Sequence, residues 1–128
     1  MTKTQEIFAL TSPYNNPYQG SYHRALFVCS AGLLRSATAA SIGTALGMNT
    51  RSCGTASYAL IPLSVNLIAW ADTIYFVNNT NYSQAVINFF DYADAVHQLE
   101  TKSVVWDIED EYEYMDAQLV KQIRANLQ

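Results

Sequence analysis

Cys29 and Arg35 lie near the two ends of a short segment, Cys29-Ser-Ala-Gly-Leu-Leu-Arg35-Ser36, whose side chains suit chemistry on an anion. A short apolar run at residues 25–28 precedes this segment, and small residues at helical spacing follow it. Where a loop leaves a strand of a parallel sheet and enters a helix, unpaired N–H groups and the positive end of the helix dipole face the ligand. The segment therefore predicts a phosphate-binding loop, called here the phosphate loop (29–36), that begins with a cysteine.

The side chains of the phosphate loop suit nucleophilic attack on a phosphoryl group. Inward N–H groups, the helix dipole and the Arg35 guanidinium all favour the thiolate form of Cys29 over the thiol. The planar fork of Arg35 can donate two parallel hydrogen bonds to the equatorial oxygens of a transferring phosphoryl group. The Ser36 hydroxyl could donate to the Cys29 sulfur and help it leave a phosphocysteine intermediate, or it could simply cap the following helix.

The pattern Cys-x5-Arg-Ser between a first strand and a first helix resembles the low-molecular-weight protein tyrosine phosphatases. Two further stretches are similar to that family, Ser52-Cys-Gly-Thr55 and Trp70-Ala-Asp-Thr-Ile74. Near the C-terminus, Trp106-Asp-Ile-Glu-Asp110-Glu-Tyr112 resembles the family's Asp-Ile-Pro-Asp-Pro-Tyr loop, and residues 106–112 are called here the acid loop. The resemblance covers residues 25–128, roughly the length of one ordinary domain.

The resemblance implies a phosphatase that hydrolyses phosphotyrosine-type monoesters through a phosphocysteine intermediate, with no metal or cofactor. Cys29 would be the nucleophile, and Asp110 would protonate the leaving oxygen and then activate the hydrolytic water, because an unprotonated alkoxide is a poor leaving group. The substrate would be a phosphotyrosine-containing protein or a small aryl phosphate. The residues that would bind the phosphate are Ser30, Ala31, Gly32, Leu33, Leu34, Arg35 and Ser36.

The role of general acid has two rivals within the acid loop. Asp107 and Glu109 lie close enough in the sequence to compete, although the position of Tyr112 in the motif favours Asp110. By the same match, Tyr112 and Leu33 would form walls of a pocket that selects an aromatic phosphoester. Both side chains could equally be ordinary half-buried packing residues.

The chain departs from the family's pattern at several positions of the two loops. Gly32 stands where the family usually has an asparagine that braces the phosphate loop, although Gly and Asn both adopt positive φ readily. Leu34 stands where many members have a second cysteine, which removes that route to a protective disulfide. Glu109 and Glu111 replace two prolines, so the acid loop loses conformational restriction and gains negative charge near an anionic substrate. Slower turnover or an altered substrate preference would follow.

The elements that must position these residues alternate along the chain. Apolar runs predict strands over residues 25–28, 50–53, 73–77 and 103–106. Helical spacing predicts helices over residues 36–48, over 61–69 with Pro62 in the first turn, over 83–92 or on toward Leu99, and over 115–127. Four strands interleaved with helices predict an α/β three-layer sandwich with a central four-stranded parallel sheet and the phosphate loop between strand 1 and helix 1.

Length and composition are consistent with this organisation. The 128 residues, half of them apolar, suit one domain over 25–128, preceded by an irregular arm over 1–24 that is rich in turn-forming residues. The net charge of −4, without a basic cluster, argues against a nucleic-acid partner. Two cysteines without a pairing pattern favour a reducing, cytoplasmic setting. No apolar run approaches the length of a membrane span, so we expect no membrane partner.

Other functions remain open from the sequence. Cys-Ser-Ala-Gly also resembles the phosphocysteine loop of sugar phosphotransferase B components, which would make the chain a phosphoryl carrier. The departures at Gly32 and beside Asp110 also fit a degenerate phosphatase that binds phosphate or a phosphoprotein without efficient turnover. An arsenate reductase is less favoured because the required three cysteines are absent, and no cysteine-protease signature surrounds His23 or His97.

Overall fold

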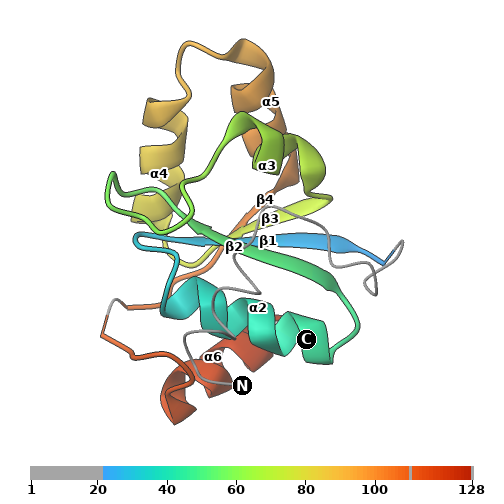
Figure 1. Ribbon diagram of the computed structural model, residues 1–128, viewed down its shortest axis with the longest axis vertical. Helices are drawn as coiled ribbons and strands as arrows, with labels where there is room; N and C mark the ends of the chain where they lie inside the picture. The colour runs from blue at the N-terminus through green and yellow to red at the C-terminus, as the bar shows by residue number, and fades with distance from the viewer. Residues whose placement is uncertain (1–21, 110, 128) are drawn as a thin grey trace.

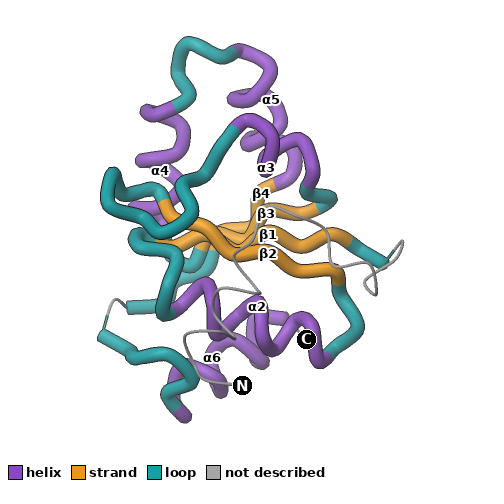
Figure 2. The backbone as a smooth tube through the Cα atoms, in the orientation of Figure 1, coloured by secondary structure: helices purple, strands orange, loops and turns teal. Residues whose placement is uncertain are grey.

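A single parallel sheet forms the centre of the protein. The computed structural model describes residues 22–109 and 111–127, so the arm predicted over residues 1–24 lies almost entirely outside the described residues. The sheet has four parallel strands in the order β2-β1-β3-β4 (Figures 1 and 2). The strands are β1 (Arg24–Cys29), β2 (Asn49–Gly54), β3 (Thr73–Phe76) and β4 (Ser103–Val105). The predicted α/β class and four-stranded parallel sheet are confirmed.

Helices cover both faces of the sheet, which confirms the predicted three layers (Figure 1). The helices α2 (Arg35–Ala45) and α6 (Ala117–Leu127) lie on one face. The other face carries α3 (Val65–Trp70), α4 (Asn79–Asn88) and α5 (Ala93–Lys102). Among the helices of the described residues, none is both long and apolar enough to cross a membrane.

The side-chain alternation of β1 divides the core into two halves. Leu26 and Val28 belong to the apolar cluster under α3, α4 and α5, whereas Phe27 and Cys29 belong to the cluster under α2 and α6. All four side chains are at most 3% exposed, as expected for a central parallel strand that is covered on both faces. This alternation directs the Cys29 sulfur toward the α2 side of the sheet.

Small residues let α2 approach the sheet closely. A Cβ atom added at Gly43 would lie 3.0 Å from a methyl carbon of Thr50 and 3.3 Å from the Phe27 ring. Ala39 and Ala40 are fully buried on the same helix. The short side chains in the sequence of α2 therefore set the distance between the helix and the strand end that carries Cys29.

Two predicted helices differ from those in the structure. The helix predicted over residues 61–69 begins only at Val65, because the Ser64 hydroxyl accepts a hydrogen bond from the Leu67 amide and caps it. Pro62 instead pairs with Gly54 in an isolated parallel bridge, so its predicted place in a first helical turn was wrong. The helix predicted from residue 83 toward residue 99 is two helices, α4 and α5, separated by residues 89–92.

The strand order places a ligand site at the carboxyl end of β1. The chain passes from β1 to β2 on one side and returns to β3 on the other, so the connections diverge at β1. In open α/β sheets, ligands bind in the crevice outside the strand ends at such a point. Cys29 at the end of β1 and Asn78 just after β3 therefore border the expected crevice.

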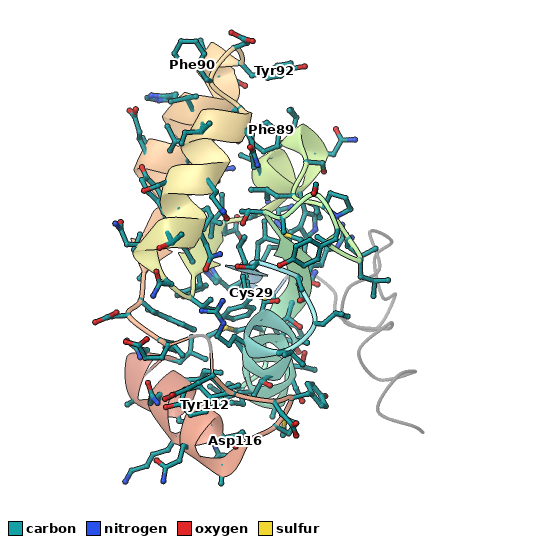
Figure 3. All side chains as sticks on the ribbon, turned by 90° about the vertical axis from the view of Figure 1, so that its left-hand side faces the viewer. Cys29, Phe89, Phe90, Tyr92, Tyr112 and Asp116 are labelled. Carbon is teal, nitrogen blue, oxygen red and sulfur yellow. The ribbon has the colours of Figure 1, made fainter. Side chains whose placement is uncertain are left out.

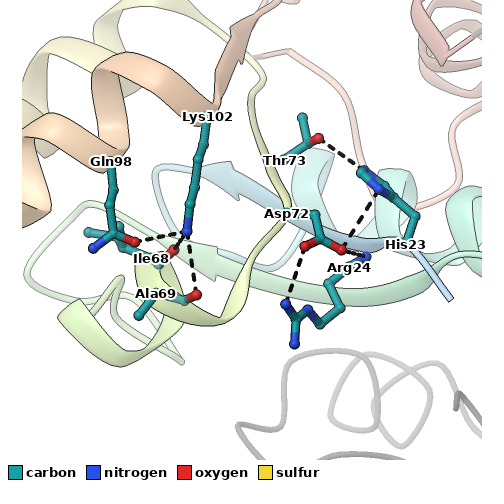
Figure 4. A network of polar contacts seen from close by, with 8 residues as sticks. All are labelled: His23, Arg24, Ile68, Ala69, Asp72, Thr73, Gln98 and Lys102. Atoms are coloured by element: carbon teal, nitrogen blue, oxygen red, sulfur yellow. Dashed lines mark hydrogen bonds and ion pairs between the residues drawn. The ribbon is translucent and has the colours of Figure 1, made fainter. Parts of the chain in front are cut away.

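The opposite end of the sheet is held by an exposed polar network (Figure 4). The Asp72 carboxylate accepts hydrogen bonds from the Arg24 amide at 2.9 Å and from the Arg24 guanidinium at 3.2 Å. His23 contacts the Thr73 hydroxyl at 2.9 Å and lies 3.8 Å from Asp72. The hydrogen bond from the Arg24 amide is the main cause that lowers the pKa of Asp72 below its ordinary value of 3.8.

A second polar contact in Figure 4 joins α5 to the end of α3. The Lys102 ammonium donates to the carbonyl oxygens of Ile68 at 3.0 Å and Ala69 at 3.4 Å, and to the Gln98 side chain at 2.8 Å. These carbonyls belong to the last turn of a six-residue helix, where the backbone lacks intrahelical donors. A cation at a helix C-terminus also interacts favourably with the helix dipole.

We predict that Asp72→Asn removes part of the acid sensitivity of the fold. Since the folded-state pKa of Asp72 is lowered, its ionised form stabilises the native state above the unfolded-state pKa, and this stabilisation is lost as the pH falls through the lowered value. The effect should be small because the side chain is 41% exposed. The free energy of unfolding, measured by urea titration between pH 2 and about 6, should decline less steeply in the variant. Asp91→Asn, at an exposed carboxylate, is the control and should keep the wild-type slope.

Candidate active site

The shape of the phosphate loop is set by backbone hydrogen bonds from the segment after β2. The amides of residues 55, 56 and 60 donate to three successive carbonyls, those of Cys29 at 3.0 Å, Ser30 at 2.9 Å and Ala31 at 3.2 Å. In a planar trans peptide the N–H points away from the C=O. The amides that follow these carbonyls therefore face the opposite side of the loop, where an anion would bind.

Gly32 meets a requirement that no other residue meets without strain. Its φ of +75° lies in the left-handed region, and a Cβ atom there would lie 2.9 Å from the carbonyl carbon of Cys53. Its amide donates to the Cys29 sulfur at 3.1 Å. Gly54 is equally constrained, because a Cβ atom there would overlap the Ser30 carbonyl oxygen. The positive φ expected at Gly32 is present.

A chain of hydroxyl groups leads from the Cys29 sulfur into the loop. Ser36 Oγ lies 3.0 Å from Cys29 Sγ and 2.8 Å from Ser52 Oγ, and Ser52 Oγ donates to the Gly32 carbonyl at 3.1 Å. The N-cap of α2 is Leu34, and Ser36 lies inside the helix. Ser36 therefore contacts the sulfur instead of capping the helix, which is the first of the two alternatives that its sequence position left open.

Arg35 is held under the acid loop. Arg35 is only 3% exposed, and its Nη1 donates a hydrogen bond to the Ile108 carbonyl oxygen at 3.0 Å. Ile108 is itself fully buried in the α2–α6 half of the core, and its amide donates to the Val77 carbonyl at 2.9 Å. The end of β3 thus anchors the acid loop, and the acid loop orients the guanidinium.

Two cavities of about 190 Å³ each open onto the phosphate loop and share Ser30 and Arg35. The first is lined by Ser30, Arg35, Asn78, Thr80, Asn81 and Glu109. The second is lined by Cys29, Ser30, Ala31, Leu34, Arg35 and Tyr58. The α2 helix begins at Arg35 with no side-chain cap, so amides of its first turn add their dipole to this region. The arrangement suits a doubly charged anion beside a sulfur nucleophile.

Comparison with solved structures identifies the architecture. The low-molecular-weight protein tyrosine phosphatase from T. tengcongensis matches 80% of this chain over 91% of its own, with 18% identity and a TM-score of 0.52. The chain has the low-molecular-weight phosphatase fold. No protein-family model matches the sequence, and no curated protein matches it.

Two structures of YwlE have the same low-molecular-weight phosphatase fold. The YwlE arginine phosphatase, in a cysteine-to-serine mutant with a phosphorylated active-site serine, matches 81% of this chain over 88% of its own, with 20% identity and a TM-score of 0.55. A YwlE mutant from Bacillus subtilis matches 82% over 90%, with 19% identity and a TM-score of 0.54. The fold is therefore shared at low sequence identity.

Within this phosphatase fold, the two predicted pocket-wall residues do not line the cavities described above. Leu34 and Tyr58 line the cavity beside Cys29, whereas Leu33 and Tyr112 line neither of the two cavities. The Tyr112 hydroxyl accepts a hydrogen bond from Gln122 Nε2 at 2.6 Å, and its ring packs against the α2–α6 core, well away from Cys29 (Figure 3). The role of Leu33 and Tyr112 as walls of a substrate pocket stays a prediction, and Leu34 and Tyr58 are the large apolar side chains that line the cavity beside Cys29.

The three candidate acids are placed differently. Asp110 lies outside the described residues. Glu109 lines the cavity that also contains Arg35, while Asp107 is exposed and lines neither cavity of the phosphate loop. Both side chains flank the fully buried Ile108 and are exposed, but only that of Glu109 lies beside Arg35. Among the described residues, no three His, Cys, Asp or Glu side chains form a group that could hold a metal ion.

Sequence reasoning overlooked Tyr58 and Asn81. Tyr58 is 75% exposed and comes from an irregular segment that follows β2, so no periodic pattern marks it. Asn81 is only 1% exposed although its residue type is usually found at the surface. Asn78 and Asn81 stand three residues apart at the start of a helix, and that spacing on one helix face was the available signal.

Cys53 behaves as a buried core residue in this fold. Both cysteines are free thiols, and Cys53 is fully buried in the core under α3. Burial raises the pKa of the Cys53 thiol well above its ordinary value, and the neighbouring Cys29 adds to the increase. A thiol that resists ionisation is a poor nucleophile, so this environment favours a packing role over a redox role.

We predict that Gly32→Ala destabilises the fold more than Gly47→Ala. Both glycines have positive φ, but nothing lies within 4 Å of a Cβ at Gly47, whereas a Cβ at Gly32 would meet the backbone of β2. Gly47→Ala should cost about 1–2 kcal/mol from the left-handed conformation alone. Gly32→Ala should cost more, because backbone must also move. Equal losses of unfolding free energy in chemical denaturation would contradict the steric argument.

Proposed function

We propose that this chain is a cysteine-dependent phosphatase that hydrolyses phosphomonoesters through a phosphocysteine intermediate. One observation carries the proposal: the Cys29 sulfur accepts a hydrogen bond from the Gly32 amide of its own loop, beside the Ser36 hydroxyl. An amide and a hydroxyl directed at a sulfur stabilise its thiolate. The buried Arg35 supplies the positive charge that a transferring phosphoryl group requires.

The reaction proceeds in two displacements at phosphorus. Cys29 Sγ attacks the phosphorus atom in line, the bond to the leaving oxygen breaks, and Asp110 donates its proton to that oxygen. Water then attacks the phosphocysteine, Asp110 takes a proton from it, and the S–P bond breaks to release phosphate and the thiolate. Arg35 and the loop amides stabilise the equatorial oxygens in both steps, and Ser36 donates to the sulfur as it leaves.

Phosphotyrosine is the first candidate substrate. Tyr58 and Leu34 stand at the mouth of the cavity beside Cys29, where they can contact the ring of an aryl phosphate. The fold shared with a protein tyrosine phosphatase supports the same choice. A phosphotyrosine-containing protein or a small aryl phosphate is therefore the proposed substrate.

Phosphoarginine is the second candidate, favoured by a specific observation. Glu109 lines the cavity next to Arg35, where its carboxylate can accept hydrogen bonds from a guanidinium group attached to the phosphate. A structure with the same fold is an arginine phosphatase. Comparison of kcat/KM for peptides carrying phosphotyrosine or phosphoarginine separates the two substrates.

We predict that wild type hydrolyses an aryl phosphate and that Cys29→Ser abolishes turnover. The expected loss is at least about 1,000-fold, because the hydroxyl of serine is a much weaker nucleophile at neutral pH than a thiolate. Asp110→Asn should lower kcat by about 100-fold or more, since general acid catalysis is removed. Release of inorganic phosphate is the measurement.

Three outcomes of that assay distinguish the competing functions. If wild type and Cys29→Ser were equally inert, the phosphatase proposal would be rejected in favour of a phosphate-binding module. A phosphocysteine that accumulates with little phosphate release, and passes its phosphate to a sugar-transport partner, would support the carrier. A burst of the phenol product followed by steady release of phenol and inorganic phosphate would support hydrolysis through the covalent intermediate.

Glu109→Gln tests the rival acid, and the sign of its effect is informative. If Asp110 is the acid, Glu109 contributes only repulsion toward an anionic substrate, so the variant should lower KM for an aryl phosphate with kcat retained. If Glu109 were the acid, kcat would fall and Asp110→Asn would be nearly silent. Glu113→Gln, at an exposed carboxylate that lines neither cavity, is the matched control.

A further inference from the structure

The α4 helix presents a row of amide side chains to the loops of the site. The row, called here the amide stripe, consists of Asn78, Asn81, Gln84 and Asn88. Asn78 caps the helix, and the other members follow at spacings of three or four residues, which place side chains on one face of a helix. No motif of the phosphate loop or acid loop includes these residues.

Asn81 contacts the phosphate loop directly. Its Nδ2 donates to the Ser30 hydroxyl at 3.1 Å, and the residue is 1% exposed. Ser30 immediately follows the nucleophile, and its carbonyl accepts the Ala56 amide at 2.9 Å. Ser30 is therefore held by its carbonyl from the β2 side and by its side chain from α4.

The other members of the stripe contact the two neighbouring loops. Asn78 Nδ2 donates at 3.4 Å to the Ile108 carbonyl, which also accepts from Arg35. Gln84 Oε1 accepts from the Thr55 hydroxyl at 2.6 Å, and Asn88 Nδ2 donates to the Thr55 carbonyl at 3.2 Å.

Thr55, which Gln84 and Asn88 contact, is itself hydrogen-bonded to the residue proposed as the nucleophile. Its amide donates to the Cys29 carbonyl at 3.0 Å. One helix face thus contacts the phosphate loop, the acid loop and the segment after β2.

Asn81 is not well explained as a stabilising residue. Its Oδ1 is buried with no hydrogen-bond partner, and an unsatisfied buried acceptor costs free energy. A side chain kept for stability would satisfy both of its polar atoms, and such exceptions concentrate at functional sites. Gly32 has no side chain with which to brace the phosphate loop from within, so the brace must come from outside it.

We propose that Asn81 is a positioning residue that braces the phosphate loop through Ser30, with the rest of the amide stripe holding the adjoining loops. The inference rests on the proposed function, because the loop it braces is the one that binds the phosphoryl group. Asn81 also lines the cavity next to Arg35, and the role proposed for it is to fix, through Ser30, where the loop amides point. A displaced loop binds phosphate less tightly and presents the sulfur less accurately.

The test combines Asn81→Ala, Ser30→Ala and the double variant. Three quantities are measured for each variant. They are the affinity for inorganic phosphate, by calorimetry; kcat/KM for an aryl phosphate; and the free energy of unfolding, by urea titration. Asn81→Ala should weaken phosphate binding and lower kcat/KM by about tenfold. In the Ser30→Ala background the Asn81 change should add little, because the hydrogen bond is already absent. Asn79→Ala, an exposed neighbour outside both cavities, should match wild type.

Other results would overturn the inference. Equal losses from Asn81→Ala in both Ser30 backgrounds, or a lower unfolding free energy with unchanged phosphate affinity, would make Asn81 merely structural. If Asn81→Ala does not fold, Ser30→Ala removes the same hydrogen bond from the loop side, and wild-type phosphate affinity in that variant would overturn the brace.

The same experiment separates this inference from the proposed function. A wild type that binds phosphate without hydrolysing aryl phosphates defeats the phosphatase proposal, and the brace is then decided by phosphate affinity alone. A wild type that neither binds phosphate nor turns over overturns both.

Discussion

The site depends on three backbone hydrogen bonds that join the segment after β2 to the carbonyls of residues 29–31. They fix the direction of each peptide plane, and the opposite face of those planes becomes a concave array of N–H donors. The positive φ of Gly32 and the absence of a Cβ at Gly54 follow from this constraint, because the two segments approach too closely for side chains. The Cys29 sulfur, the start of α2 and the cavities are arranged around that array.

The hydroxyl chain beside Cys29 couples the charge of the sulfur to the loop. Three contacts join Cys29, Ser36, Ser52 and the Gly32 carbonyl, and the thiol with two hydroxyls supplies one hydrogen for each. Once the sulfur is ionised, two hydrogens remain for three contacts. Ser36 then donates its hydrogen to the sulfur, and the Ser52 hydroxyl can donate either to Ser36 Oγ or to the Gly32 carbonyl, but not to both. One hydrogen bond of the chain is therefore lost on ionisation. The Gly32 amide donates to the sulfur whether it is a thiol or a thiolate, which limits the free-energy cost of that lost hydrogen bond.

The sequence specified the parts of the site that depend on local order along the chain. Cys29, Arg35 and Ser36 occur in one strand–loop–helix unit, so their meeting follows from the local elements, and the parallel sheet follows from the alternation of strands and helices. Tyr58 and Asn81 depend on tertiary contacts between segments that are distant in sequence; Tyr58 has no local signature, and the spacing of Asn78 and Asn81 on one helix face does not reveal that Asn81 contacts Ser30. The extent of α3 was missed because Pro62 was assigned to a first turn, while Ser64 supplied the true cap. The break between α4 and α5 was missed because apolar residues continue through it.

The phosphate loop is held mainly by hydrogen bonds between main-chain atoms, so most of its side chains do not determine its shape. Carbonyl and amide groups are common to nearly all residues, so positions such as Ala31, Leu33 and Leu34 can change during evolution without altering the anion cradle. The glycines are exceptions because their restriction is steric, and Ser30 is another because its hydroxyl accepts a hydrogen bond from Asn81. In this architecture the anion-binding backbone of the phosphate loop can therefore stay the same while the side chains around the cavities change one by one. This separation is consistent with a fold that the chain shares at 20% identity with an arginine phosphatase and at 18% identity with a protein tyrosine phosphatase.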